Sequence, residues 1–190
     1  MEEWLISVED LTKATQALRS SMPSAVFAVE NHAGFHREQK YLARWDLGID
    51  DAGSAQIEEH FDQPAMKFLV RSVNHELSSD EMLKIAQKEL KGIATATHSN
   101  SSESLLEISA MGVSKGETLA KLAQRLNISA AEVITFGDNP NDISMLEWSG
   151  RSYAMATAHP AAQAAAKLIA PECNDDGVAQ VLEKLLIADA

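Results

Sequence analysis

The sequence is poor in cysteine, in basic residues and in long apolar runs. Its single cysteine, Cys173, cannot form a disulfide within the chain, and a cysteine without a nearby partner is more often structural than catalytic. No apolar run approaches the roughly 18 residues that a membrane-spanning helix needs. The N-terminal stretch MEEWLISVEDL also lacks the basic patch and long apolar core of a signal peptide. These absences predict a cytoplasmic protein.

The scarcity of basic residues limits the possible partners. Sixteen lysines and arginines stand against 28 acidic residues, which gives a formal net charge of −12. Such a charge repels nucleic acids and anionic membranes, and no local cluster of lysine or arginine reverses it. We therefore expect neither nucleic acid nor a membrane as a partner. The same acidity disfavours phosphorylated substrates, so a phosphate site here would need a metal ion and a few local cations.

The composition is that of a folded protein with one or two domains. The chain has 190 residues, of which 45% are apolar and 23% are charged. Up to about Ser109, helix and strand patterns alternate irregularly, and residues 31–51 give no clear assignment. The expected helices open at Ser7 and Ser78, and the expected strands are 25–30, 67–73, 93–98 and 105–108. This order predicts an α+β layer, with helices on one face of an antiparallel sheet.

From Ser114 onward the alternation becomes regular. A helix that opens at Ser114 precedes strands expected at 133–136, 153–155 and 168–170, and further helices lie between and after these strands. The stripe of the first helix that is expected to be buried consists of Leu119, Leu122, Ala123 and Leu126. Such alternation predicts a parallel sheet with right-handed crossovers. We therefore predict an α/β fold in two parts, residues 1–109 and residues 110–190.

The most informative stretch is VITFGDNPNDISML, residues 133–146. The expected buried strand leads into Gly137, which permits a sharp turn, and Pro140 suits the first position of a helix. Asp138 and Asp142 are thereby held near one another outside the carboxyl end of a strand, where ligands bind in such folds. Paired carboxylates on a short loop suit Mg²⁺. The alternative interpretation, an Asx-turn with a helix N-cap, accounts for only one of the two acids.

Lys115 is a second candidate site residue. It follows Ser114 at the expected start of a helix, where backbone amides and an ammonium group together can hold an anion. A lysine at a helix start is also commonly just solvated. The position alone therefore leaves both interpretations open.

Three blocks of sequence, in this order along the chain, resemble the haloacid dehalogenase (HAD) superfamily in its Cof-type branch of capped phosphatases. EISAMGVSKGETLAKLAQRLNIS resembles the region of the third motif, GDNPNDISML the fourth motif, and YAMATAHPAAQAAAKLIAPECNDDGVAQVLEKLL the C-terminal end. The match is close from Glu107 onward and looser before it. It implies a Mg²⁺-dependent phosphohydrolase of small phosphorylated metabolites such as sugar phosphates. Residues 1–109 would be an α+β (C2-type) cap domain, and residues 110–190 would be the C-terminal part of a Rossmann-like parallel core.

The resemblance also implies roles for single residues. Lys115 would contact the phosphoryl group and the nucleophilic aspartate, which makes it both catalytic and substrate-binding. Asp138 would ligate the metal directly, and Asp142 would be a second ligand or would orient Asp138. Asn141 would contact the phosphate or the lysine. Thr157 departs from the pattern, because Ala156-Thr157 stands where members often have Gly-Asn, but it keeps a hydroxyl donor.

The largest departure from the superfamily is an absence. Its members begin with an Asp-x-Asp-Gly-Thr-like loop, in which the first Asp attacks phosphorus and the second acts as general acid and base. The nearest combination in this chain is Asp50-Asp51-Ala52-Gly53, which lacks both the spacing and a preceding buried strand. The resemblance therefore implies a cap plus the C-terminal half of the core, with the N-terminal core segment missing through truncation, cleavage or a gene split. We expect the chain alone to be inactive.

The absent segment has a structural consequence. In the superfamily, the strand that ends in the nucleophile lies next to the strand expected at 133–136. Without that neighbour, the strand should present unpaired backbone groups and an uncovered apolar face. This predicts a homodimer or association with a separate N-terminal core segment.

Other interpretations remain open at this point. The alternative function is a non-catalytic binding or assembly module that keeps the metal-binding loop as a scaffold. Hydrolysis by a Ser/His/Asp triad is not supported, because the chain has no Gly-x-Ser-x-Gly motif. His32 and His36, which are expected to share a loop, have no third zinc ligand nearby and are interpreted as solvated side chains.

Overall fold

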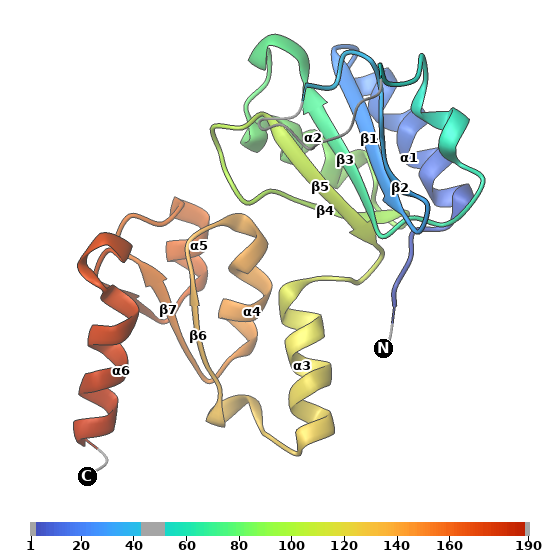
Figure 1. The fold of residues 1–190 in the computed structure, drawn as a ribbon. Helices are drawn as coiled ribbons and strands as arrows, with labels where there is room; N and C mark the ends of the chain where they lie inside the picture. Colours follow the sequence, from blue (N-terminus) through green and yellow to red (C-terminus); the bar gives the residue numbers. More distant parts are fainter. Residues whose placement is uncertain (1–2, 43–51, 189–190) are drawn as a thin grey trace. The chain divides into compact units, whose positions relative to one another are not determined.

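Figure 1 shows the structure, a computed structural model in which residues 3–42 and 52–188 are described. The chain forms two compact units, Met1–Val113 and Ser114–Ala190. The pair Asp50-Asp51 lies outside the described residues. No helix in the described part of the chain is long and apolar enough to cross a membrane.

The described residues of the first unit form a five-stranded antiparallel sheet with two α-helices. Its strands follow the order β2-β1-β3-β5-β4. The elements are α1 (Val8–Ser21), β1 (Ala25–Asn31), β2 (Gly34–Arg37), η1 (Ile57–His60), β3 (Lys67–Ser72), η2 (Val73–His75), α2 (Ser79–Glu89), β4 (Ala94–Thr97) and β5 (Leu105–Ala110). Both helices begin where the sequence predicts, because Ser7 and Ser78 accept hydrogen bonds from backbone amides of the first turns. The predicted α+β layer is therefore confirmed for this part of the chain.

The core of the first unit lies between the two helices and one face of the sheet. Alternate residues of β1, β3 and β5 point to this face, as the two-residue period of a strand requires. Phe27 and Phe68 stack there with ring centroids 5.3 Å apart, and both are fully buried. Leu11 of α1 and Met82 of α2 close the core from the helical side. Burial of these large apolar side chains is the main source of stability in this unit.

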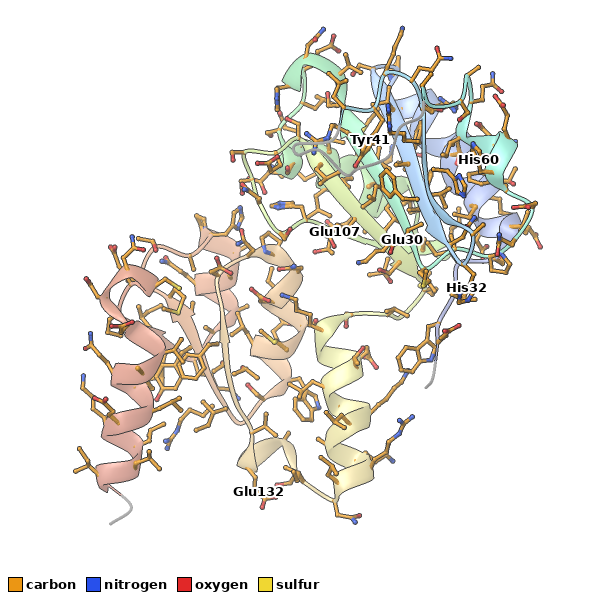
Figure 2. All side chains as sticks on the ribbon, viewed as in Figure 1. Glu30, His32, Tyr41, His60, Glu107 and Glu132 are labelled. Atoms are coloured by element: carbon orange, nitrogen blue, oxygen red, sulfur yellow. The ribbon has the colours of Figure 1, made fainter. Side chains whose placement is uncertain are left out.

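The opposite face of the same sheet carries polar side chains (Figure 2). The Lys67 ammonium lies 3.2 Å from a Glu107 carboxylate oxygen and 3.3 Å from the Ser109 hydroxyl. Glu30 is the cross-strand partner of Lys67. At the other end of this face, Tyr41 belongs to a small apolar cluster that includes residues of β1. This face is therefore polar at one end and apolar at the other, whereas the face that packs on the helices is apolar.

Strand β2 was not predicted from the sequence. It forms a hairpin with β1, and Gly34 accommodates the tight connection with a φ of +133°. His36 consequently lies on a strand, so its assignment to one loop with His32 is wrong. Its ring stacks on His60 of η1, with centroids 4.3 Å apart. With only four residues, the strand is too short to show a recognisable alternation of apolar and polar residues.

The second unit has a three-stranded parallel sheet in the order β6-β7-β8. Its elements are α3 (Lys115–Leu126), η3 (Ala130–Glu132), β6 (Ile134–Gly137), η4 (Pro140–Asp142), α4 (Ile143–Trp148), β7 (Arg151–Met155), α5 (Pro160–Ala165), β8 (Leu168–Ala170), η5 (Cys173–Asp175) and α6 (Gly177–Ala188). The core includes Leu146 of α4, Ala154 of β7, Ala162 of α5 and Val181 of α6. The predicted helix-strand alternation and parallel sheet are confirmed here.

The predicted buried stripe of α3 is wrong for two of its four residues. Ala123 is buried and Leu119 is partly buried, but Leu122 and Leu126 are 51% and 58% exposed. Helix α3 packs against α4, and no strand among the described residues covers its two leucines. Strand β6 pairs only with β7 in the described part of the chain, so its other edge is open, and Ile134 on this strand is also exposed. The apolar spacing of α3 is intact, but the surface that would bury it is not supplied by these residues.

We predict that Phe68→Ala lowers the free energy of unfolding of the first unit by about 3 kcal/mol or more, because it removes a fully buried ring and leaves a cavity against Phe27. Urea titrations followed by circular dichroism measure the change. Leu42→Ala is the control, since this side chain is 73% exposed and its removal should change stability little. Equal losses for the two variants would contradict the described core.

Candidate functional site

The acidic loop follows β6 directly and turns immediately into η4 and α4. Gly137 is the last residue of the strand. A Cβ at this position would lie 2.5 Å from the Cβ of Asp142, so the loop can fold back on the strand only if residue 137 is glycine. Pro140 occupies the first turn of η4, as the sequence predicts. The backbone thus brings Asp142 against the end of β6.

Asp142 is the buried centre of this loop. Its side chain is only 4% exposed. One carboxylate oxygen, Oδ2, accepts hydrogen bonds from the backbone amides of Asp138 and Asn139, at 2.9 and 3.1 Å. The other oxygen, Oδ1, accepts a hydrogen bond from the Lys115 ammonium group. Burial alone would raise the pKa of Asp142, but these hydrogen bonds outweigh it and hold the pKa below its ordinary value of 3.8.

The contacts of Asp142 bear on whether it could ligate a metal ion. Both of its oxygens already accept hydrogen bonds, and direct metal ligation would compete with them. The geometry therefore favours the orienting role for Asp142 over that of a metal ligand. Because the same carboxylate holds two loop amides and the lysine, it fixes the loop and Lys115 relative to each other.

Asp138 has the opposite environment. It is exposed, and no hydrogen bond to its carboxylate is found within the described ranges. Its backbone carbonyl accepts a hydrogen bond from the His159 amide at 2.8 Å, which ties the loop to the segment that follows β7. A carboxylate held on a fixed backbone, with its oxygens free, is a suitable ligand for a hard divalent cation.

Lys115 is the first residue of α3 and lies 27 residues before Asp142 in the chain. Ser114 caps the helix by accepting a hydrogen bond from the Glu117 amide at 3.1 Å. The Lys115 side chain is 49% exposed, so its ammonium contacts Asp142 on one side and solvent on the other. The structure thus brings Lys115 and Asp142 together, as a phosphate site would require.

The two remaining predicted site residues are less closely connected. Asn141 is on the same loop, and its Oδ1 atom is buried without a hydrogen-bond partner among the described residues. Thr157 is exposed and follows β7, the strand next to β6 in the parallel sheet. It therefore lies near the same edge of the sheet, but no hydrogen bond joins it to the other four residues in the described structure.

Two residues of this region were missed by the sequence analysis. Ser144 of α4 accepts a hydrogen bond from the Gly116 amide of α3 at 3.0 Å. His159 holds the carbonyl of Asp138, as described above, and its Nδ1 accepts a hydrogen bond from the Ala161 amide at 3.1 Å. The only sequence signal for the first contact is a pair of small residues, Gly116 and Ser144, and their spacing in the chain gives no indication that they meet.

We predict that Asp142→Asn lowers the free energy of unfolding by about 2 kcal/mol at neutral pH, since it weakens charged hydrogen bonds to two amides and to a half-exposed lysine. The folded-state pKa of Asp142 is depressed, so its contribution is complete above the ordinary value of 3.8 and is lost as pH falls below it. Urea titrations at a series of pH values should show the difference between the two proteins shrinking below that pH.

Asp138→Asn serves as the matched control on the same loop. Its carboxylate is exposed and makes no hydrogen bond within the described residues, so stability should change little at any pH. A stability loss in Asp142→Asn that is the same at all pH values would contradict the role assigned to its carboxylate.

Comparisons with known proteins identify the family of this chain. The model of a family described as haloacid dehalogenase-like hydrolase matches residues 6–182. The putative phosphatase YxeH of Bacillus subtilis (strain 168) is 44% identical over 75 residues, which cover 40% of this chain and 28% of that protein. The 5-amino-6-(5-phospho-D-ribitylamino)uracil phosphatase YbjI of Escherichia coli (strain K12) is 36% identical over 116 residues, 59% of this chain and 42% of that protein. The matches thus span less than half the length of each relative.

Solved structures share the fold. SMU.1108c from Streptococcus mutans UA159 aligns with a TM-score of 0.76 at 23% identity, over 98% of this chain and 71% of that one. The HAD subclass IIB sugar phosphatase BT4131 aligns with a TM-score of 0.74 at 18% identity, over 97% of this chain and 68% of that one. These likenesses confirm the predicted α/β fold class. Because the family model covers most of the sequence, the chain belongs to the haloacid dehalogenase-like hydrolases.

Proposed function

We propose that this chain is part of a Mg²⁺-dependent phosphatase of the Cof type, which acts on small phosphorylated metabolites such as sugar phosphates. The observation that carries the proposal is the contact between Lys115 and the buried Asp142 on a loop whose other acid, Asp138, faces outward. The relatives YxeH and YbjI are named phosphatases, and the structural neighbour BT4131 is named a sugar phosphatase, which supports the same reaction class.

The charges of the loop fit a divalent cation. Two carboxylates and one ammonium group leave a single negative charge, which would repel a phosphate. A bound Mg²⁺ would reverse that sign and would neutralise charge on the phosphoryl oxygens. Asp138 would be its protein ligand, because its carboxylate is exposed and makes no hydrogen bond among the described residues. Mg²⁺ suits one or two carboxylates together with water and substrate oxygens, so this sparse donor set is chemically adequate.

Lys115 would bind the substrate's phosphoryl oxygens through its exposed side while Asp142 fixes it from the buried side. An ammonium group held in this way needs little reorganisation when charge develops on the transferring group. Asn141 and Thr157 would add hydrogen-bond donors at the same edge of the sheet. Direct ligation by Asp142 remains the alternative to its orienting role.

The two units would have different tasks in this proposal. Residues 1–109 would form a C2-type cap domain, and residues 110–190 would form the C-terminal part of the phosphatase core. The regular helix-strand alternation of the second part and the antiparallel layer of the first support this division. A cytoplasmic location stays a prediction.

We further propose that catalysis needs a nucleophile from outside these 190 residues. The sequence contains no Asp-x-Asp loop after a buried strand. In the described structure β6 has one open edge, and Leu122, Leu126 and Ile134 are exposed in the same unit. An added strand beside β6 would supply both backbone partners and an apolar cover. This supports an incomplete catalytic unit.

Hydrolysis of a general aryl phosphate tests the proposal. The chain alone should be inactive with and without Mg²⁺, and a segment carrying an Asp-x-Asp strand, fused ahead of Met1, should produce Mg²⁺-dependent activity. In that fusion, Asp138→Asn should lower kcat/KM by at least about 100-fold, because it removes the proposed metal ligand. Asp175→Asn, at an exposed acid of the same unit, should leave activity unchanged. Robust turnover by the chain alone would refute the missing-nucleophile argument.

A second candidate function is a non-catalytic binding or assembly module that keeps the loop as a scaffold. The absence of an Asp-x-Asp loop is the observation that favours it. This function requires that metal or phosphate binds without turnover, even in the fusion with an Asp-x-Asp segment. Asp138→Asn should then leave binding of a protein partner intact, whereas it should abolish activity in an enzyme.

The exposed leucines predict self-association when no other segment covers them. On gel filtration, the chain alone should elute above the mass of a monomer, as a homodimer or larger species. The double substitution Leu122→Gln and Leu126→Gln should shift it toward the monomer, since it removes apolar surface from α3. Leu42→Gln, at a still more exposed leucine of the first unit, should have no such effect. A concentration-independent monomer for the unaltered chain would contradict this prediction.

A further inference from the structure

Helices α3 and α4 meet at one close backbone contact beside the candidate site. The Gly116 amide of α3 donates a hydrogen bond to the Ser144 hydroxyl of α4 at 3.0 Å. A Cβ on residue 116 would lie 2.4 Å from the carbonyl oxygen of Ser144, so the two backbones are nearly in contact. The absence of a side chain on Gly116 is what lets the Ser144 hydroxyl reach the first turn of α3.

This contact satisfies an amide that the helix cannot satisfy itself. The first four amides of an α-helix have no partner within the helix. In α3, the Glu117 amide is held by Ser114 and the Gly116 amide by Ser144. Ser144 therefore acts as a second cap for α3, supplied from a neighbouring helix.

This cap lies directly beside the candidate site. Lys115 contacts Asp142 through its side chain, and the next residue, Gly116, contacts Ser144 through its backbone. Two consecutive residues of α3 are thus fixed to Asp142, the last residue of η4, and to Ser144, the second residue of α4. The contact with Asp142 fixes the position of the Lys115 ammonium group. The contact with Ser144 fixes the backbone from which the Lys115 side chain extends.

Fixing the start of the side chain matters because lysine is long and flexible. An ion pair of a half-exposed lysine is weak when it must order four rotatable bonds by itself. When the backbone is held at Gly116, the Lys115 ammonium group can reach fewer positions, and more of these allow contact with Asp142. The Ser144 hydroxyl holds the backbone beside Lys115, although no hydrogen bond in the described structure joins it to the Lys115 or Asp142 side chain.

We propose that Ser144 is a positioning residue for Lys115, which acts by holding the first turn of α3 against α4 through the Gly116 amide. Its importance for catalysis rests on the proposed phosphatase function, whereas the effect on Lys115 does not. The proposal can therefore be tested on the full chain without any measurement of activity.

The test is competitive trace acetylation of the native chain, read by mass spectrometry of its peptides. The quantity compared is the acetylation rate of Lys115 divided by that of Lys91, an exposed lysine of the first unit. In Ser144→Ala this ratio should rise roughly 2- to 5-fold, because a Lys115 side chain that is no longer held against Asp142 is more accessible to the reagent. Ser144→Thr, which retains a hydroxyl, should return the ratio to that of the unaltered chain.

Ser149→Ala is the matched control for general loosening of the second unit. Ser149 is a fully buried serine that follows α4, and its hydroxyl bonds to Thr135 rather than to α3. This variant should lose stability to urea but keep the Lys115 ratio of the unaltered chain. An unchanged ratio in Ser144→Ala, or an equal rise in Ser149→Ala, would overturn the proposal. Because activity is not measured, failure of the phosphatase proposal would leave this result interpretable.

Discussion

The buried carboxylate of Asp142 is the constraint on which the candidate site depends. A carboxylate that is removed from water is stable only if its charge is compensated by strong hydrogen bonds. Here the compensation comes from the amides of Asp138 and Asn139 and from the Lys115 ammonium group. These partners belong to the loop itself and to the start of a distant helix. One buried charge therefore fixes the loop and also brings the lysine to it.

The outward position of Asp138 follows from that arrangement. Its amide is used to hold Asp142, and its carbonyl is held by the His159 amide, so the backbone at this residue is fixed on both sides. The carboxylate is left exposed at the end of β6. Two acids that look equivalent in the sequence thus have different environments: Asp142 is buried and accepts three hydrogen bonds, whereas Asp138 is exposed.

Much of this site could be predicted from the sequence. The strand-loop-helix pattern around Gly137 and Pro140 predicted where the loop lies, because local backbone preferences determine its course. The resemblance to HAD phosphatases singled out Lys115. The structure brings this lysine to Asp142 across 27 residues of chain, which no local pattern could show. The difference in environment between Asp138 and Asp142 also required three-dimensional contacts.

The features that were missed depend on tertiary contacts. Leu122 and Leu126 have the spacing of a buried stripe, but burial requires a partner surface, and the described residues provide none for them. The Gly116–Ser144 contact depends on how closely two helices approach, which composition does not reveal. The hairpin strand β2 is so short that its turn at Gly34, rather than any periodicity, defines it.

In the proposed function, a divalent cation would bind at Asp138 while the carboxylate of Asp142 keeps its contact with Lys115. Mn²⁺-induced line broadening in the ¹⁵N-labelled full chain tests this most directly, because a paramagnetic ion broadens only the signals of nearby nuclei. The amide signals of the loop that contains Asp138 should broaden first, and Asp138→Asn should remove the effect. Broadening centred on other acidic residues, or unchanged in Asp138→Asn, would contradict it.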